Sequence, residues 1–241
     1  MTKLALVLCT ALLVSAGFCY AGQVVASRDD RFEVSAIKAV RPSLVSTLAA
    51  LKKGDVAQAK TAFEAYDAGW NGIEVYINTR DKSMYDELEK NLQERITKRL
   101  ASPSPDVGTL TTDAQTMLTK FDEAIANAEK AAPLNPLYDD VARLRIVRAN
   151  FRPVMPALKA GDIAKARQSV AAFSGKLGSI DGLLKGRSPE ASEAVAKGTA
   201  DLMSTLKADK PDVAQATGLA AGVMEKYNAV VAEITKDARS H

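Results

Sequence analysis

The chain contains one sequence pattern twice, and this repetition restricts the folds that it can adopt. Residues 50–60 read ALKKGDVAQAK, and residues 157–167 read ALKAGDIAKAR. The same register continues through the later pairs Tyr66/Phe173, Ile73/Ile180 and Arg80/Arg187. A two-residue shift then pairs Ser83 with Ser188. Because a unit of about 100 residues far exceeds the length of solenoid repeats, the pattern predicts a duplicated domain.

Each copy is predicted to contain four helices, because its apolar residues recur at spacings of three and four. In the first copy, Gly54 is placed to end the first helix, while Asp55, Ser83 and Asp106 are placed to cap the next three. In the second copy, the expected helices cover residues 141–159, 163–184, 189–207 and 213–235. Short connections between amphipathic helices favour an all-α fold, a tandem duplication of a four-helix up-and-down bundle.

The amino terminus is typical of a secretory signal peptide. Lys3 precedes an apolar run of roughly 15 residues, too short to span a membrane, and we expect cleavage after Ala21. Both cysteines, Cys9 and Cys19, lie inside this segment, so the mature chain should hold no thiol. No later segment is read as apolar enough to span a bilayer. We therefore expect a periplasmic or otherwise exported protein that does not insert into the membrane after cleavage.

Two prolines at the middle of the chain predict a boundary between the copies. Pro133 and Pro136 interrupt any continuous helix there, which divides the mature chain into residues 22–132 and 137–241.

Composition excludes several classes of protein. Apolar residues make up 47% and charged residues 25%, as in soluble globular chains. Lys and Arg total 32 against 29 Asp and Glu, too even a balance for a nucleic-acid binder. The only histidine is His241, which disfavours histidine catalysis and histidine metal sites. With no nucleophile–base pattern visible either, the sequence predicts a protein that is not an enzyme.

Acidic residues border the apolar stripe of the second predicted helix. At 100° per residue, Asp67 and Glu74 lie beside the stripe that contains Phe63 and Trp70, and Glu64 lies nearer its rim. The third helix adds Tyr85 and Glu89, again beside the apolar face. If these helices are neighbours, the side chains should converge. The corresponding residues of the second copy are assigned as Ala171, Ser174, Asp181, Glu190 and Ala194.

Two interpretations of these residues stay open. Clustered carboxylates with a phenol can form an all-oxygen site for a hard cation such as iron. The same acids can instead be boundary charges, paired with arginines such as Arg95 and Arg99 and of little energetic consequence. Trp70 is interpreted as a large core residue in preference to a stacking platform for a ligand.

Two segments resemble a known family. Residues 63–74, FEAYDAGWNGIE, and residues 83–89, SMYDELE, resemble the extracytoplasmic amino-terminal region of bacterial high-affinity iron permeases. Residues 210–228 are similar to the last helix of that region. The membrane domain of the permeases and its Arg-Glu-x-x-Glu motif are absent, and Val75 stands where their pattern is often acidic. The resemblance implies a free-standing relative in iron uptake, with an iron permease or another envelope protein as partner.

The leading hypothesis is a non-enzymatic, exported helical-bundle protein that binds or delivers a metal ion, with iron as the expected metal. Its expected ligands are Glu64, Asp67, Glu74, Tyr85 and Glu89. The alternative is a structural or interaction module of the cell envelope that has no small ligand.

Overall fold

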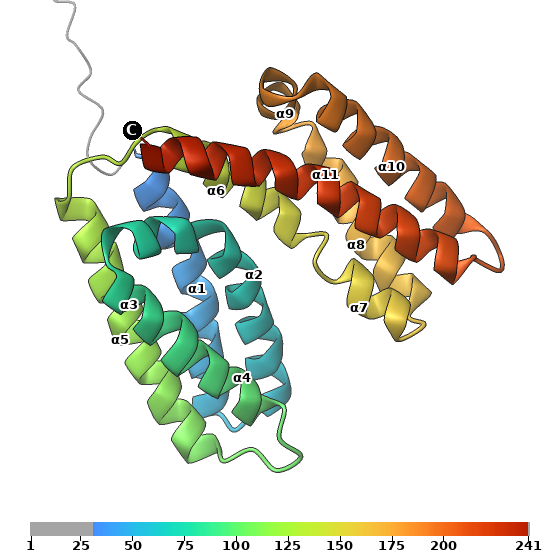
Figure 1. The fold of residues 1–241 in the computed structure, drawn as a ribbon. Helices are drawn as coiled ribbons and strands as arrows, with labels where there is room; N and C mark the ends of the chain where they lie inside the picture. Colours follow the sequence, from blue (N-terminus) through green and yellow to red (C-terminus); the bar gives the residue numbers. More distant parts are fainter. Residues whose placement is uncertain (1–30, 241) are drawn as a thin grey trace, which may run out of the picture.

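The computed structural model describes residues 31–240, and every regular element within this range is helical (Figure 1). The expectation of an all-α fold is confirmed for this range, which contains no strand. The expected signal peptide, with Cys9 and Cys19, and the single histidine, His241, lie outside the described residues.

The first half of the described chain is built from α1 (Phe32–Lys52), α2 (Val56–Arg80), α3 (Lys82–Asp86), a π-helix η2 (Glu87–Gln93), α4 (Glu94–Leu100) and α5 (Val107–Lys130). Helix α1 packs against α2 and α5, and η2 and α4 pack against α5. The stripe residues that the sequence predicted, from Ile37 to Leu51 on α1 and from Phe63 to Ile77 on α2, are buried in its interior.

The second half contains α6 (Leu137–Ala149), α7 (Val154–Lys159), α8 (Ile163–Leu177), α9 (Asp181–Arg187), α10 (Pro189–Lys207) and α11 (Val213–Ser240). Two of its expected helices are wrong as single helices. The segment 141–159 breaks between α6 and α7, because Pro153 has no N–H and its ring clashes with the preceding turn. The segment 163–184 breaks between α8 and α9 at Gly178, a residue of low helix propensity.

Capping residues fix where the helices begin. Asp55 and Asp106 accept hydrogen bonds from backbone N–H groups three residues later, as the sequence predicted. The cap expected at Ser83 is wrong, because Asp81 accepts from the N–H of Met84 at 2.9 Å. Asp81 has φ −150° and ψ 97°, and Ser188, which caps α10, has φ −151° and ψ 98°. The two copies therefore stay in register here without the expected two-residue shift.

The π-helix lies where the residue-number offset between corresponding positions of the two halves changes by one. From Asp81 to Asp106 the chain is one residue longer than from Ser188 to Asp212. The shorter segment holds α10, a regular α-helix, whereas the longer one contains η2. A π-turn accommodates one extra residue within a helix and often lies at a functional site. Both Glu89 and Gln93 lie in η2.

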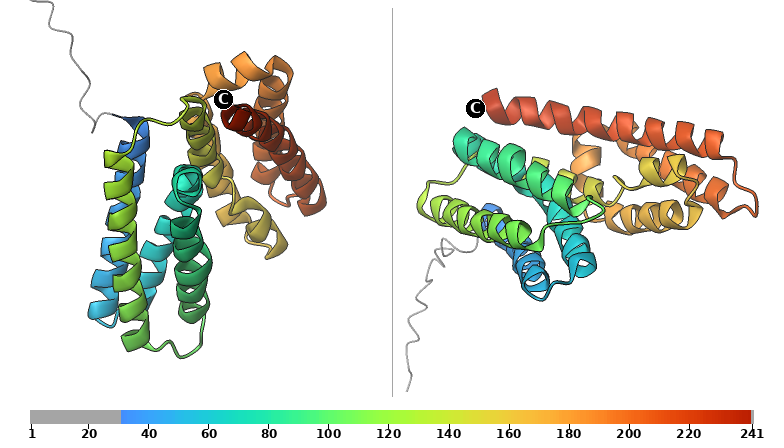
Figure 2. Two further views of the ribbon diagram at one scale, coloured as in Figure 1. Left: turned by 60° about the vertical axis from the view of Figure 1, so that its left-hand side comes forward. Right: turned by 90° about the horizontal axis from the view of Figure 1, so that it is seen from below.

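The two halves lie side by side and share one apolar core. Figures 1 and 2 show residues 32–130 as one group of helices and residues 137–240 as another. Helix α2 packs against α6, and the buried side chains form one continuous cluster through both halves. The end of α11 lies at the junction, where Asn135 donates to the carbonyl of Ala238 at 3.4 Å.

Helix α1 is long and apolar enough to cross a membrane by length and composition, contrary to the expectation that no segment after the signal peptide would be. Half of its apolar window is buried inside the protein. Val34, Ile37 and Leu44, each at most 1% exposed, belong to the shared core.

We predict that Gly72→Ala destabilises the junction between the halves. A Cβ built at Gly72 would overlap Cγ1 of Ile146 on α6 and lie 3.4 Å from its Cα, so the Ile146 side chain or α6 itself must shift. Overpacking of this kind costs about 1–3 kcal/mol in the free energy of unfolding. Urea denaturation measures the change. Gly175→Ala on α8 is the control, because a Cβ there meets nothing within 4 Å. A loss no greater than that of the control would contradict close packing at Gly72.

Candidate functional site

Helices α2 and η2 bring three carboxylates together, Asp67, Glu74 and Glu89, which we call the acidic cluster. Asp67 and Glu74 lie two turns apart on α2, beside the fully buried Tyr66 and Trp70. The charges of all three carboxylates raise the pKa of the Tyr66 hydroxyl, although burial is the larger cause. All three carboxylates therefore lie near enough to Tyr66 for their charges to act on its hydroxyl.

Glu89 accepts a hydrogen bond from Nε1 of Trp70. A buried indole N–H needs an acceptor, so this contact supplies a structural reason for a carboxylate at position 89. The expectation that Trp70 is a core residue is confirmed. Burial and the charge of Glu74 raise the pKa of Glu89, and the bond from Trp70 only partly opposes them. Binding a proton or a cation would therefore stabilise the Glu89 carboxylate in this environment.

Asp67 has a partner on each of its oxygens. Oδ1 accepts from Nε2 of Gln93 at 2.7 Å, and Oδ2 accepts from Nη1 of Arg152 at 3.1 Å. Gln93 comes from η2 and Arg152 from the turn after α6. Asp67 therefore links its own helix both to the π-helix and to the second half of the chain.

Glu74 forms a half-buried ion pair with the second half. Its Oε1 accepts from Nη1 of Arg145 on α6 at 2.8 Å, and the two side chains are only 20% and 18% exposed. Burial raises the pKa of Glu74, and the positive charges of Arg145, Arg148 and Arg152 do not fully offset this effect. Desolvation thus outweighs the attraction of three cations at this carboxylate.

Tyr85 covers the edge of the site. The Tyr85 ring stacks against Trp70 with the two ring centroids 6.2 Å apart. Nζ of Lys82 lies 5.4 Å from the centroid of the Tyr85 ring. Burial, then the charges of Glu74 and Glu89, raise the pKa of Tyr85. Its hydroxyl therefore belongs to the same electrostatic environment as the acidic cluster.

Three buried side-chain atoms in the described residues have no hydrogen-bond partner, and all three surround the acidic cluster. They are the hydroxyl of Tyr66, Oε1 of Gln93 and Nε of Arg145. Unpaired buried polar atoms cost about 1–3 kcal/mol each. Their gathering in one place indicates a site that water or a ligand completes.

Two sequence expectations fail at this site. Glu64 is exposed on α2 and does not appear among the charges that shift the pKa of Tyr66, Glu74 or Glu89. Arg95 and Arg99, the expected partners of the acids, instead pair with Asp113 on α5.

Sequence reasoning missed the residues that enclose the acidic cluster from the second half. Arg145, Arg148 and Arg152 are spaced by three and four residues, which places them on one face of a helix. That spacing was a usable signal, but the contact between α2 and α6 was needed to connect it with the acids. Gln93 was missed because the π-turn moves it onto the face beside Asp67.

Among residues 31–240, no three His, Cys, Asp or Glu side chains lie close enough together to hold a metal ion without rearrangement. Comparison of the chain with protein-family models, curated proteins and solved structures found no match.

We predict that Glu89→Gln flattens the pH dependence of stability. The folded-state pKa of Glu89 is raised, so the folded protein holds its proton more tightly than the unfolded chain does. The free energy of unfolding should therefore fall as the pH rises from about 4.3 through the raised pKa, and the variant should lose this slope. Gln still accepts from Trp70. Urea denaturation at several pH values measures the slope, and exposed Glu193→Gln is the control. An unchanged slope in Glu89→Gln would show that Glu89 titrates normally.

Proposed function

We propose that this protein is a non-enzymatic, exported helical protein that binds a hard cation, with iron as the expected metal, at the acidic cluster and hands it over. The observation that carries the proposal is that the charges of three carboxylates act on the buried Tyr66 hydroxyl, which has no hydrogen-bond partner, and that Oε1 of Gln93, whose Nε2 donates to Asp67, has none either. Two of the unpaired atoms, the Tyr66 hydroxyl and Oε1 of Gln93, are oxygens. Hard cations prefer oxygen ligands of this kind.

The electrostatics support the same proposal. The pKa values of Glu74 and Glu89 are both raised by burial, so their charged forms lack sufficient compensation. A bound cation would stabilise both charged forms and lower both pKa values. Tyr85 lies at the edge of this site, and Glu64 is no longer included among the ligands.

The cation would have to displace an arginine. Glu74 is bound by Arg145 and Asp67 by Arg152, and no preformed group of three metal-binding side chains exists in the described residues. We infer that a cation competes with Arg145 for Glu74. Such a site suits reversible binding better than permanent retention, which agrees with delivery of the metal.

The proposal includes a tandem duplication in which only the first copy keeps the site. Corresponding residues support the duplication: Tyr66 meets Phe121 edge-on at 5.9 Å, and Phe173 meets Tyr227 in the same manner at 5.6 Å. Gly54 and Gly161, with φ 74° and 72°, turn the chain at equivalent places. Asp181, which corresponds to Glu74, is bound by Lys185 and Ser192 instead.

The second candidate function is an envelope interaction module without a small ligand. One observation favours it: Asp67 and Glu74 already have arginine partners, which gives both acids a structural role at the junction. In either case the proposed location is the periplasm or another exported compartment. The proposed partner, an iron permease or another envelope protein, rests on the sequence resemblance alone.

We predict that Glu74→Gln and Glu89→Gln each weaken the binding of ferrous iron at least about tenfold, or about 1.4 kcal/mol. Each substitution removes one anionic ligand and preserves the size of the side chain. Anaerobic calorimetric titration of the mature chain measures the affinity, and manganese serves as a second hard cation.

Asp181→Asn is the matched control, because it removes one carboxylate from the corresponding place in the second half. Its affinity for ferrous iron should equal that of the unaltered protein. An equal loss in the control would mean that binding is non-specific. If the unaltered protein showed no saturable binding of either metal, the interaction module would replace the metal site.

A further inference from the structure

A hollow of about 480 Å³ lies between α6 and α11 and is lined by basic side chains. Arg145 and Arg148 come from α6, and Lys236 and Arg239 come from α11. The remaining lining residues are Asn228, Val231, Ala232, Thr235 and Ser240. No carboxylate belongs to this lining, so the described part of the chain leaves the hollow strongly positive.

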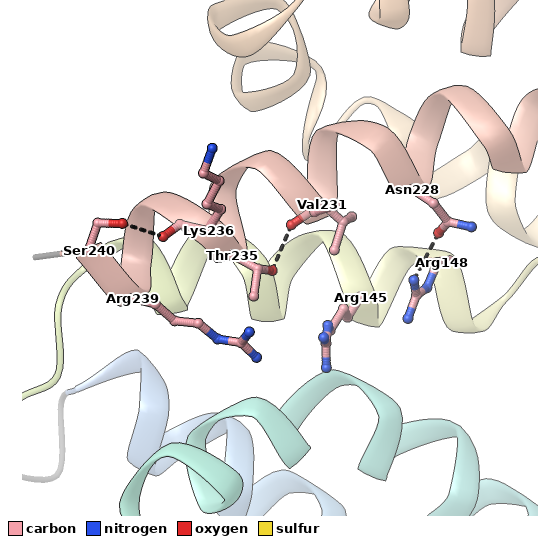
Figure 3. Close-up of a pocket in the computed structure, with 9 residues that line it drawn as sticks. Arg145, Arg148, Asn228, Val231, Thr235, Lys236, Arg239 and Ser240 are labelled. Atoms are coloured by element: carbon pink, nitrogen blue, oxygen red, sulfur yellow. Dashed lines mark hydrogen bonds between the residues drawn. The ribbon is translucent and has the colours of Figure 1, made fainter.

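Two of these cations have no anionic partner within residues 31–240. Arg145 is neutralised by Glu74, but Arg148 bonds only to the amide oxygen of Asn228, at 2.8 Å. Arg239 takes part in no ion pair among these residues. Burial and the charge of Arg145 lower the pKa of Arg148, and the charge of Glu74 only partly opposes them, so the charge of Arg148 is incompletely compensated. Figure 3 shows the guanidinium groups of Arg145 and Arg239 on the same side, whereas Lys236 extends away from them.

The chemistry of these groups selects an oxyanion. A guanidinium presents paired N–H donors that match two oxygens of a carboxylate or phosphate. Arg148 and Arg239, neither of which forms an ion pair within residues 31–240, can offset negative charge on such a ligand. The partial burial of Arg148 strengthens its attraction for an anion relative to a fully exposed arginine. Thr235 and Ser240 also line the hollow, but their hydroxyls donate to the carbonyls of Val231 and Lys236 on the same helix, so the arginines are the donors left for an anion.

We propose that this hollow, the arginine pocket, binds a small oxyanion, a phosphate or a dicarboxylate, among the basic side chains of α6 and α11. The pocket shares Arg145 with the ion pair to Glu74, but Arg148, Lys236 and Arg239 pair with none of the three carboxylates of the acidic cluster, and the proposal does not require a bound metal.

Calorimetric titration with inorganic phosphate and with succinate tests the proposal on the mature full chain, without metal and at constant salt. We expect saturable binding of at least one of the two anions. Arg148→Gln and Arg239→Gln should each weaken it at least about fivefold. Arg239 is exposed at the end of α11, so its substitution leaves the core intact. Lys226→Gln, also exposed on α11 but outside the pocket, is the matched control and should bind normally.

Three results would overturn the proposal. The first is the absence of saturable binding of phosphate or succinate at concentrations up to about 10 mM. A dissociation constant of about 10 mM corresponds to a binding free energy of about 2.7 kcal/mol. The second is an equal loss in Lys226→Gln, which would reduce the effect to net charge. The third is a protein that binds neither phosphate nor succinate but co-sediments with phosphatidylglycerol vesicles in a way that requires Arg239. That result would assign the surface to membrane binding.

Discussion

The ion pair between Glu74 and Arg145 is the interaction on which the polar part of the structure depends. It joins α2 of the first half to α6 of the second, a contact that also contains the hydrogen bond from the Tyr76 hydroxyl to Asp139. Removing both charges from water costs several kcal/mol per ion, and mutual attraction repays this only with good additional hydrogen bonds. Here the compensation is incomplete, because the pKa of Glu74 stays raised and Nε of Arg145 has no partner.

Arg145 thereby connects two regions of opposite charge. Its Nη1 bonds to Glu74 in the acidic cluster, and its side chain also lines the arginine pocket between α6 and α11. A change at either place must alter the charge balance of the other. Gly72 on α2 approaches Ile146 on α6 closely, and Ile146 is the residue after Arg145.

The helices and their buried faces could be predicted from the sequence because spacing and capping are local properties. Asp55, Asp106 and Gly54 behave as expected for this reason. The expectation of a continuous helix over 141–159 was wrong because Pro153 interrupts the helix before α7. The cap at Asp81 was missed because the shift between the copies was placed too early, before the π-turn that absorbs the extra residue.

The candidate site was predictable only in part. The α2 wheel placed Asp67 and Glu74 beside the core, and the structure brings Glu89 to them. Their partners could not be predicted, because Arg145 and Arg152 are distant in sequence and belong to the other half. Contacts between the two halves leave no periodic signal in the sequence of either half. The expectation that Arg95 and Arg99 pair with the acids of the cluster was therefore wrong, and both arginines pair with Asp113 instead.

The central claim is that Arg145 occupies a carboxylate that a cation can also use. The most direct measurement is the affinity of Arg145→Gln for ferrous iron, compared with that of the unaltered protein under the same anaerobic conditions. Removing the competing charge should tighten binding, by about tenfold for a competitor worth about 1.4 kcal/mol. Thermal unfolding of the variant without metal establishes that it is folded. An affinity that is unchanged or weaker would contradict the account and leave the pair of Glu74 and Arg145 as a structural contact only.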